Sequence, residues 1–414
     1  MDIQTIRTRC CIVGGGPAGM MLGYLMGRAG IETIVLEKHV DFLRDFRGDT
    51  VHPSTLEIMH ELGLLDEFLT CPHTKITEIA LEIGRQTIKV GDFSRLPTVA
   101  KFLAFMPQWD FLNFLLEKGR RYPHLKIIMQ AEVTDLIEEQ DTIAGVLVQT
   151  PNGPLRVHAD LTIGCDGRGS RMRERAGLEV ENLGAPIDVL WFRLSKHAND
   201  PGQVLGHLDR GKMIVTLDRG DYWQCAFVIP KGGMATLQSK GVAAFQREVA
   251  AGAPFLADRV SEIESLDHVK LLSVEVNRLN RWSRAGLLCI GDAAHAMSPV
   301  GGVGINLAIQ DAVATANLLC AILQTRVPTL DELDSVRQRR LFPARMVQAA
   351  QMAVHKRVLM PTIAQSDRPL QAPWPVLLLN HVAWLRGLTA RMIGMGVRPE
   401  HVRSPDTIRA TPPT

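Results

Sequence analysis

The stretch that decides the fold is residues 10–19, which read Cys-Cys-Ile-Val-Gly-Gly-Gly-Pro-Ala-Gly. Its apolar start predicts a buried strand, and the glycines that follow have the spacing G-x-G-x-x-G. Gly14 permits a tight turn, Gly16 lets the backbone approach a diphosphate, and Gly19 lets a helix pack closely on the strand. The stretch therefore predicts the first half of a dinucleotide-binding unit.

The residues that follow complete this unit. A helix predicted over residues 20–26 turns its N-terminal N–H groups and its positive dipole end toward the diphosphate. Residues 33–36 then predict a second buried strand, which ends at Glu37 and Lys38. A carboxylate at this position favours an unphosphorylated ribose, because a 2′-phosphate would meet a like charge. FAD and NAD both satisfy that requirement, so this unit alone leaves the choice between them open.

Two later segments repeat the pattern of a strand that breaks at a carboxylate. Residues 159–165 predict a strand that ends at Asp166 and Gly167, and residues 286–290 predict one that ends at Gly291 and Asp292. A second glycine-rich loop follows, and a long helix is predicted from about Leu307 to Leu323. A carboxylate at a strand end can accept hydrogen bonds from a polyol, and the N–H groups of the loop can face the edge of an electron-rich ring.

These three motifs, in this order, resemble those of the FAD-dependent aromatic hydroxylases, the single-component flavoprotein monooxygenases similar to para-hydroxybenzoate hydroxylase. The resemblance covers about residues 8–345. It implies an α/β fold in which a Rossmann-like FAD-binding domain is interleaved with a substrate domain on a mostly antiparallel sheet, followed by C-terminal helices. The expected FAD-binding domain comprises residues 1–73, 98–178 and 268–338, the substrate domain residues 74–97 and 179–267, and the helical region residues 339–414.

The resemblance also implies roles for individual residues. Arg47 would lie near the flavin diphosphate and the nicotinamide cofactor, Gln108 near the ribityl chain or phosphate, and Val133 against the adenine. Pro299 would line the face of the flavin ring where oxygen reacts. The expected cofactor-binding set is Gly14, Gly16, Pro17, Ala18, Gly19, Glu37, Lys38, Arg47, Gln108, Val133, Asp166, Gly167, Gly291, Asp292, Pro299, Gly302, Gly304, Ile305 and Asn306.

The chemistry that the resemblance implies is hydroxylation of a phenolic, heteroaromatic or quinol-like small molecule. NADH or NADPH would reduce FAD, and O2 would react through a C4a-hydroperoxyflavin. Pro299, Arg47 and His52 are the candidate catalytic residues, whereas His295 is expected to be structural. The alternatives are a reductase or halogenase of the same fold, acting on an isoprenoid or aromatic substrate, and a flavin-binding protein without enzyme activity. A halogenase is expected to show a W-x-W-x-I-P segment, which this sequence lacks.

Segments between the second and third motifs predict the substrate sheet. Apolar runs at 186–194, 213–217 and 222–230 are separated by turn residues, as in an antiparallel sheet. The candidate pocket residues are Trp191, Arg193, Tyr222 and Gln224. Strand alternation places Trp191 and Arg193 on one face, where Arg193 could pair with a carboxylate or phenolate of the substrate.

Composition limits the remaining function classes. The 414 residues are 46% hydrophobic and carry a net charge of +2, which argues against a nucleic-acid partner bound through bulk charge. The seven cysteines form no CxxC motif, so we expect neither a zinc site nor a disulfide framework, and a cytoplasmic location fits. No apolar run approaches the ~18 residues of a membrane span, so no integral membrane segment is expected.

The sequence does not decide what the C-terminal part of the chain contacts. The apolar residues 377–379 and 382–385 predict one apolar helix. Packing in the core or against a second copy in a homodimer is one interpretation, and contact with a lipid surface is the other.

Overall fold

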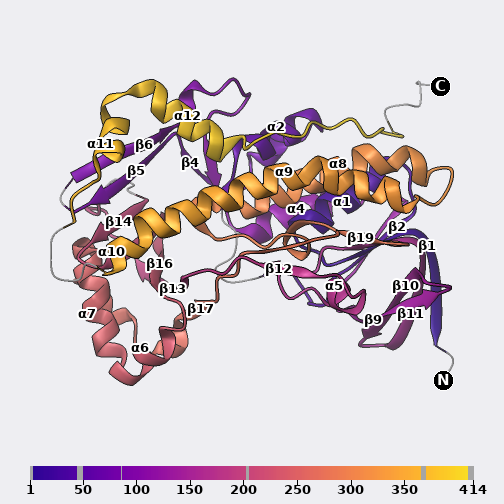
Figure 1. The fold of residues 1–414 in the computed structure, drawn as a ribbon, viewed down its shortest axis with the longest axis horizontal. Helices are drawn as coiled ribbons and strands as arrows, with labels where there is room; N and C mark the ends of the chain where they lie inside the picture. The colour runs from indigo at the N-terminus through magenta and orange to yellow at the C-terminus, as the bar shows by residue number, and fades with distance from the viewer. Residues whose placement is uncertain (1–2, 44–49, 85, 202–204, 365–369, 409–414) are drawn as a thin grey trace.

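The strand that precedes the first glycine loop lies in the centre of a parallel sheet (Figure 1). This sheet belongs to a computed structural model that describes residues 3–43, 50–84, 86–201, 205–364 and 370–408. β1 (Gln4–Val13) pairs in parallel with β2 (Thr33–Leu36) on one side and β11 (Gly153–Gly164) on the other. The order continues outward to β8 (Leu125–Ile128) beyond β2, and to β20 (Leu287–Cys289) and β19 (Ser283–Arg284) beyond β11.

The three motifs meet at one edge of this sheet because the strands before them are parallel neighbours. Val13, Gly164 and Cys289 are the last residues of β1, β11 and β20, and they lie in register across the sheet. β9 (Glu132–Glu139) and β10 (Thr142–Thr150) extend β11 as an antiparallel meander. The fold predicted from the sequence, with a parallel sheet assembled from distant segments, is therefore confirmed.

Two helices pack together over the parallel sheet. α1 (Pro17–Arg28) contacts α8 (Gly304–Leu323), and α9 (Leu330–Val354) lies along α8 (Figure 1). α4 (Gln108–Gly119) contacts α1 as well. The boundary expected between residues 338 and 339 falls inside α9, which continues through it.

One helical stretch, Val300–Leu323, is long and apolar enough to cross a membrane by length and composition. However, 72% of its most apolar window is buried inside the protein, and Asn306, Gln310 and Asp311 are among its buried residues. A core helix of a folded domain has the same properties, so the stretch is weak evidence for a membrane span. The sequence predicted the helix from about Leu307 to Leu323, but the expectation of no membrane segment considered only unbroken apolar runs and did not identify it as a candidate span.

The second sheet is mostly antiparallel, as predicted. Its strands run in the order β17-β13-β16-β15-β14-β5-β6, and only β14 and β5 pair in parallel. Helices α6 (Met234–Lys240) and α7 (Val242–Gly252) follow β16, and the Phe245 ring of α7 lies 5.3 Å from that of Phe192. The strands are β17 (Lys270–Leu272), β13 (Ile187–Ser195), β16 (Tyr222–Pro230), β15 (Lys212–Asp218), β14 (Gly206–Asp209), β5 (Glu78–Ile83) and β6 (Gln86–Asp92).

The C-terminal part forms two short helices, where the sequence predicted one. α11 (Trp374–His381) and α12 (Ala383–Gly394) are separated at Val382, whose backbone is extended. The prediction of a single helix was wrong because apolar composition does not reveal the break. α12 packs on β6, the edge strand of the second sheet (Figure 1).

The chain then returns across the FAD-binding domain as an extended tail, residues 396–408. Arg28 of α1 donates a hydrogen bond to the Ser404 carbonyl oxygen at 2.7 Å and forms an ion pair with Asp406 at 3.2 Å. The backbone N–H of Val402 donates to the Glu61 carboxylate at 2.7 Å. Glu400 accepts hydrogen bonds from Arg339 at 2.8 Å and Arg340 at 3.3 Å. The tail thus joins helices that are distant in sequence.

Candidate active site

The first glycine loop has the shape that a diphosphate requires. Gly14 has a φ of +106°, and a side chain on Gly19 would lie 1.9 Å from the Gly14 carbonyl oxygen, so both positions need glycine. A Cβ on Gly16, in contrast, would meet no atom of the described residues within 4 Å. The space beside Gly16 at the N-terminus of α1 is therefore open to an anionic group.

Glu37 lies directly beside this loop. Its carboxylate accepts hydrogen bonds from the backbone N–H groups of Gly15 at 2.9 Å and His39 at 3.0 Å. It therefore orders the glycine loop in addition to the ribose contact that the sequence predicts. α1 begins at Pro17, three residues before the predicted start, so Pro17 and Ala18 belong to its first turn, and Lys38 is exposed.

The second and third motifs contact each other through Arg168, which the sequence analysis did not single out. Its Nε lies 3.3 Å from the Asp292 carboxylate, whereas its buried Nη1 has no partner among the described residues. A buried donor without a partner costs free energy unless a ligand supplies the acceptor. Together with the space at Gly16, this donor fits a polyanionic, polyol-containing cofactor such as FAD.

Asp166 has protein partners in the structure. Its carboxylate accepts hydrogen bonds from Ser170 Oγ at 2.6 Å and from the Met172 N–H at 3.1 Å, at the start of α5 (Arg171–Arg175). Gly167 has a φ of +83°, so this turn favours glycine. The predicted role of Asp166 toward the cofactors stays a prediction.

The remaining predicted cofactor contacts are placed as follows. Val133 is buried in β9, and its carbonyl oxygen accepts a hydrogen bond from Arg171 at 2.8 Å. Gln108 is the first residue of α4 and is half-buried. Gly291 has a φ of +60° and packs against Ala18. Arg47 lies outside the described residues.

The loop at the N-terminus of α8 is clamped by Asn306. Its side chain accepts hydrogen bonds from the His52 N–H and Thr55 Oγ, both at 2.8 Å, and donates to the carbonyl oxygens of Thr50 at 3.0 Å and Gly302 at 3.3 Å. The clamp brings the segment around His52 to the loop that contains Gly302. A Cβ on Gly304 would meet no described atom within 4 Å, so the first turn of α8 also faces open space. Pro299 and Ile305, the other predicted contacts of this loop, are half-buried.

His52, a candidate catalytic residue, is completely buried. Its Nδ1 lies 2.8 Å from the carbonyl oxygen of Ile393 in α12, so Nδ1 carries the proton and Nε2 is left as an acceptor. Nε2 is buried and has no partner among the described residues. Burial lowers the pKa of His52 to about 4, against the opposing effect of the Ile393 carbonyl, so its ring is neutral at pH 7.

His295 belongs to a buried charged cluster. Its Nε2 lies 2.5 Å from the Asp311 carboxylate, which also accepts hydrogen bonds from Arg340 Nε at 2.8 Å and the Gly291 N–H at 3.1 Å. Burial acts to raise the pKa of Asp311, but His295 and Arg340 outweigh it and hold that pKa below its ordinary value. This environment agrees with the structural role expected of His295.

Helix α9 holds the loop that contains Pro299, a feature that the sequence analysis missed. The Gln351 side chain accepts a hydrogen bond from the Ser298 N–H at 3.1 Å and donates to the carbonyl oxygens of Ser298 at 2.8 Å and Val300 at 2.9 Å. Ser298 Oγ lies 2.8 Å from His355 Nε2. Only the spacing of Gln348, Gln351 and His355, which places them on one helix face, could have suggested this contact.

The predicted substrate residues differ in their surroundings. Trp191 packs against an apolar cluster that includes Val189 and Ala226, and Val300, which follows Pro299, packs against the same cluster. The shared cluster places the Trp191 face of the second sheet close to the predicted flavin loop.

The other three predicted substrate residues lie at the end of β13 and the start of β16. Arg193 is exposed and stacks on the Tyr222 ring, with its guanidinium carbon 5.0 Å from the ring centre. Gln224 is buried and accepts a hydrogen bond from Arg219 at 3.1 Å. Their contact with substrate stays a prediction.

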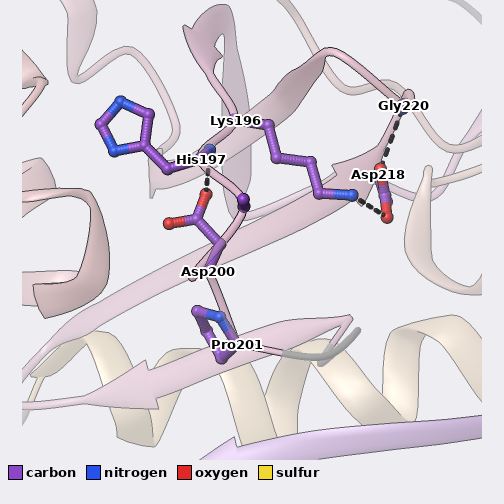
Figure 2. A pocket seen from close by; sticks show the side chains of 7 residues that line it. Lys196, His197, Asp200, Pro201, Asp218 and Gly220 are labelled. Atoms are coloured by element: carbon purple, nitrogen blue, oxygen red, sulfur yellow. Dashed lines mark hydrogen bonds and ion pairs between the residues drawn. The ribbon is translucent and has the colours of Figure 1, made fainter.

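A pocket of about 310 Å³ opens elsewhere, between the loop after β13 and the turn from β15 to β16 (Figure 2). Its polar groups bind one another, since Lys196 Nζ lies 2.7 Å from Asp218 and the Gly220 N–H donates to Asp218 at 2.9 Å. Asp200 is held by Arg259 at 2.7 Å. The pocket contains none of the predicted site residues, and its groups stabilise the loop.

Comparisons with known proteins identify the family of this chain. A family model described as an FAD binding domain matches residues 7–350. The 6-methylpretetramide 4-monooxygenase of Streptomyces rimosus is 34% identical over 336 residues, which cover 81% of this chain and 80% of that protein.

Solved structures show the same fold. OxyS anhydrotetracycline hydroxylase from Streptomyces rimosus aligns with a TM-score of 0.73 at 23% identity, covering 95% of this chain and 77% of that one. The p-nitrophenol 4-monooxygenase PnpA from Pseudomonas putida aligns with a TM-score of 0.72 at 20% identity, covering 93% and 99%. The length of the family match and the 34% identity establish that this chain belongs to the FAD-dependent monooxygenases, a family that includes aromatic hydroxylases.

Proposed function

We propose that the protein uses NAD(P)H and O2 to place one hydroxyl group on an electron-rich aromatic small molecule. The observation that carries this proposal is that Trp191 of the second sheet and Val300 of the predicted flavin loop pack against the same apolar cluster, because this brings the apolar face of the sheet close to that loop. The chemistry that FAD supplies when bound is acceptance of a hydride, then transfer of one atom of O2 to an aromatic carbon while the other leaves as water. The free cysteines fit a reducing, cytoplasmic environment.

The residues of the chain would bind and orient the two reactants. Gly14, Gly16 and the N-terminus of α1 would hold the diphosphate, and Glu37 the ribose. Arg168 Nη1, which is buried without a described partner, would donate to the diphosphate or ribityl region beside Asp292. The backbone N–H groups at the start of α8 would face the pyrimidine edge of the flavin ring.

The apolar layer around Trp191 would exclude water from the reacting atoms. His52 Nε2, a buried acceptor on a neutral ring, would take a hydrogen bond from a hydroxyl group of the substrate. This contact would orient a phenol and hold its proton at a defined atom.

A substrate screen tests the proposed function. FAD-loaded protein is mixed with NADH or NADPH and with 6-methylpretetramide, anhydrotetracycline, p-nitrophenol, hydroxybenzoates, heteroaromatic acids, quinols or polyketides. We expect at least one compound to accelerate both NAD(P)H oxidation and O2 consumption, and to gain one oxygen atom by mass. Substrate-dependent oxidation of NAD(P)H without O2 consumption would contradict hydroxylation and indicate a reductase.

Gln351→Glu is expected to uncouple NAD(P)H oxidation from hydroxylation. The carboxylate would face the carbonyl oxygens of Ser298 and Val300 in place of the amide donor, so the loop beside Pro299 would be displaced. The measurement is the ratio of hydroxylated product to NAD(P)H consumed. This ratio should recover as the pH is lowered, because a protonated carboxyl can donate one of the two lost hydrogen bonds.

Gln348→Glu is the matched control for Gln351→Glu. Gln348 lies one turn earlier on α9 and also donates to two carbonyl oxygens, those of Asn277 at 2.8 Å and Ala296 at 3.1 Å. We expect both variants to lower the melting temperature and only Gln351→Glu to lower the product ratio. An equal loss of the product ratio in both variants would mean that Gln351 acts only by packing α9 against the rest of the protein.

A further inference from the structure

The two helices α11 and α12 present an apolar stripe to the outside of the molecule. Trp384, Leu388 and Met392 are spaced by four residues along α12 and are 65%, 49% and 50% exposed. On α11, Trp374 is 77% and Leu378 43% exposed. A solvated surface helix normally turns its polar face outward, so exposed apolar side chains that recur every four residues indicate an interaction surface. We call these five side chains the apolar stripe.

The opposite side of α12 is firmly anchored, so its outward face is fixed by packing. Ala390 is completely buried in an apolar cluster with Phe93, and Ile393 packs against the same cluster. A Cβ on Gly394 would lie 3.1 Å from both Phe93 and Pro53, which shows how closely the helix approaches the body of the protein. The carbonyl oxygen of Ile393 also holds His52. Turning the apolar stripe inward would break all of these contacts.

The segment that carries the apolar stripe has charges of one sign, whereas the neighbouring Arg95 is paired with Asp92 at 3.5 Å. Residues 370–399 contain no Asp or Glu, although the whole chain carries a net charge of only +2. Arg391 is exposed on α12, between Leu388 and Met392 in sequence. The Arg95 side chain is 58% exposed and passes beside Gly387 of α12, where an added Cβ would lie 3.9 Å from Arg95 Cδ. Arg386, in contrast, caps α11 by donating to Leu379 and Asn380.

This charge pattern discriminates between two occupants of the stripe. In a symmetric dimer the same patch meets itself, so Arg391 would approach its own copy without an acid from residues 370–399 to pair with it. An anionic lipid surface, in contrast, offers phosphates to Arg391 and acyl chains to the apolar side chains. Tryptophan is also suited to the boundary between headgroups and acyl chains. We propose that the apolar stripe of α11 and α12 docks the protein on the surface of an anionic lipid bilayer.

The test is sedimentation of FAD-loaded full-length protein with vesicles of phosphatidylcholine alone or of phosphatidylcholine with phosphatidylglycerol in equal amounts. We expect about tenfold tighter binding to the vesicles that contain phosphatidylglycerol, and weaker binding in 1 M salt, where the Debye length is about 3 Å. Trp384→Ser/Leu388→Ser should lower the affinity about tenfold or more, and Arg391→Glu about fivefold or more. Leu271→Ser removes a side chain that is 47% exposed on β17, outside the stripe, and should change nothing.

Three results would overturn this proposal. The first is equal binding to both kinds of vesicle, and the second is unchanged binding of Trp384→Ser/Leu388→Ser with a wild-type melting temperature. The third is a concentration-dependent dimer in sedimentation velocity that this double variant dissociates, which would make the stripe an interface between two copies. Vesicle binding does not depend on turnover, so the outcome is independent of the proposed hydroxylation.

Discussion

Gly16→Ala is expected to fold as the wild type does and to lose FAD affinity by about tenfold or more. Gly16 has a φ of −74°, which alanine adopts without strain, and its Cβ would meet no described atom of the protein within 4 Å. The same Cβ would occupy the space through which a phosphate approaches the backbone N–H groups of the loop. Loss of a hydrogen bond to a charged group costs about 1.5–3 kcal/mol, which corresponds to the expected loss of FAD affinity. The measurement is titration of the apoprotein with FAD, followed by flavin fluorescence.

Gly19→Ala provides the contrasting control. Its Cβ would lie 1.9 Å from the Gly14 carbonyl oxygen, a backbone atom that cannot move without displacing β1. We expect this variant to lose about 3 kcal/mol of folding free energy, measured by urea unfolding of the apoprotein. If Gly16→Ala instead melts as early as Gly19→Ala, or binds FAD as tightly as the wild type, then the space beside Gly16 does not hold the diphosphate.

Asp311→Leu is expected to destabilise the protein by about 3–5 kcal/mol, the cost of breaking a buried ion pair from one side. Asp311 and Arg340 are both completely inaccessible to solvent, so the substitution leaves the guanidinium buried, with Glu400 at 3.3 Å as its remaining acid among the described residues. Urea unfolding measures this loss. The double variant Asp311→Leu/Arg340→Met removes both charges and should be more stable than the single variant. A double variant that is less stable would show that burial of the unpaired arginine is not the cause.

The same ion pair predicts the response to acid. The pKa of Asp311 is held below its ordinary value in the folded protein. The unfolded chain therefore binds the proton first, and the stabilising contribution is complete above the unfolded pKa of about 4. It is lost as the pH falls through the lower folded pKa. We expect the free energy of unfolding of the wild type to fall more steeply below pH 4 than that of Asp311→Leu, as measured by urea titration at each pH.

The fold could be predicted because its decisive patterns are local. Each decisive pattern depends on a few consecutive residues with a fixed steric task. These patterns are the strand followed by Gly14, Gly16 and Gly19, and the later strands that end at Asp166 and Asp292. Parallel pairing then brings the three strand ends together, since β1, β11 and β20 are neighbours. The alternation of β13 placed Trp191 on one face in the same way.

The contacts that hold the site from outside could not be predicted. Gln351 reaches Ser298 from 53 positions away, and the Ile393 carbonyl reaches His52 from 341 positions away. The local sequence of α9 or α12 does not identify these partners, because the contacts depend on how the helices pack against the rest of the protein. Arg168 was missed for a different reason, since its relevance lies in a buried atom without a partner, which only coordinates reveal.

The tail that crosses the FAD-binding domain also bears on the order of folding. The family match ends at residue 350, yet Arg28 of the first helix, Glu61 and Arg340 each have a partner among residues 400–406. During synthesis, the contacts of these three charged side chains with residues 400–406 cannot form until that segment has left the ribosome. We therefore expect a fragment cut at residue 350 to be less stable than the whole chain, and FAD binding to appear late in translation, after residues 400–406 have packed on the first helix.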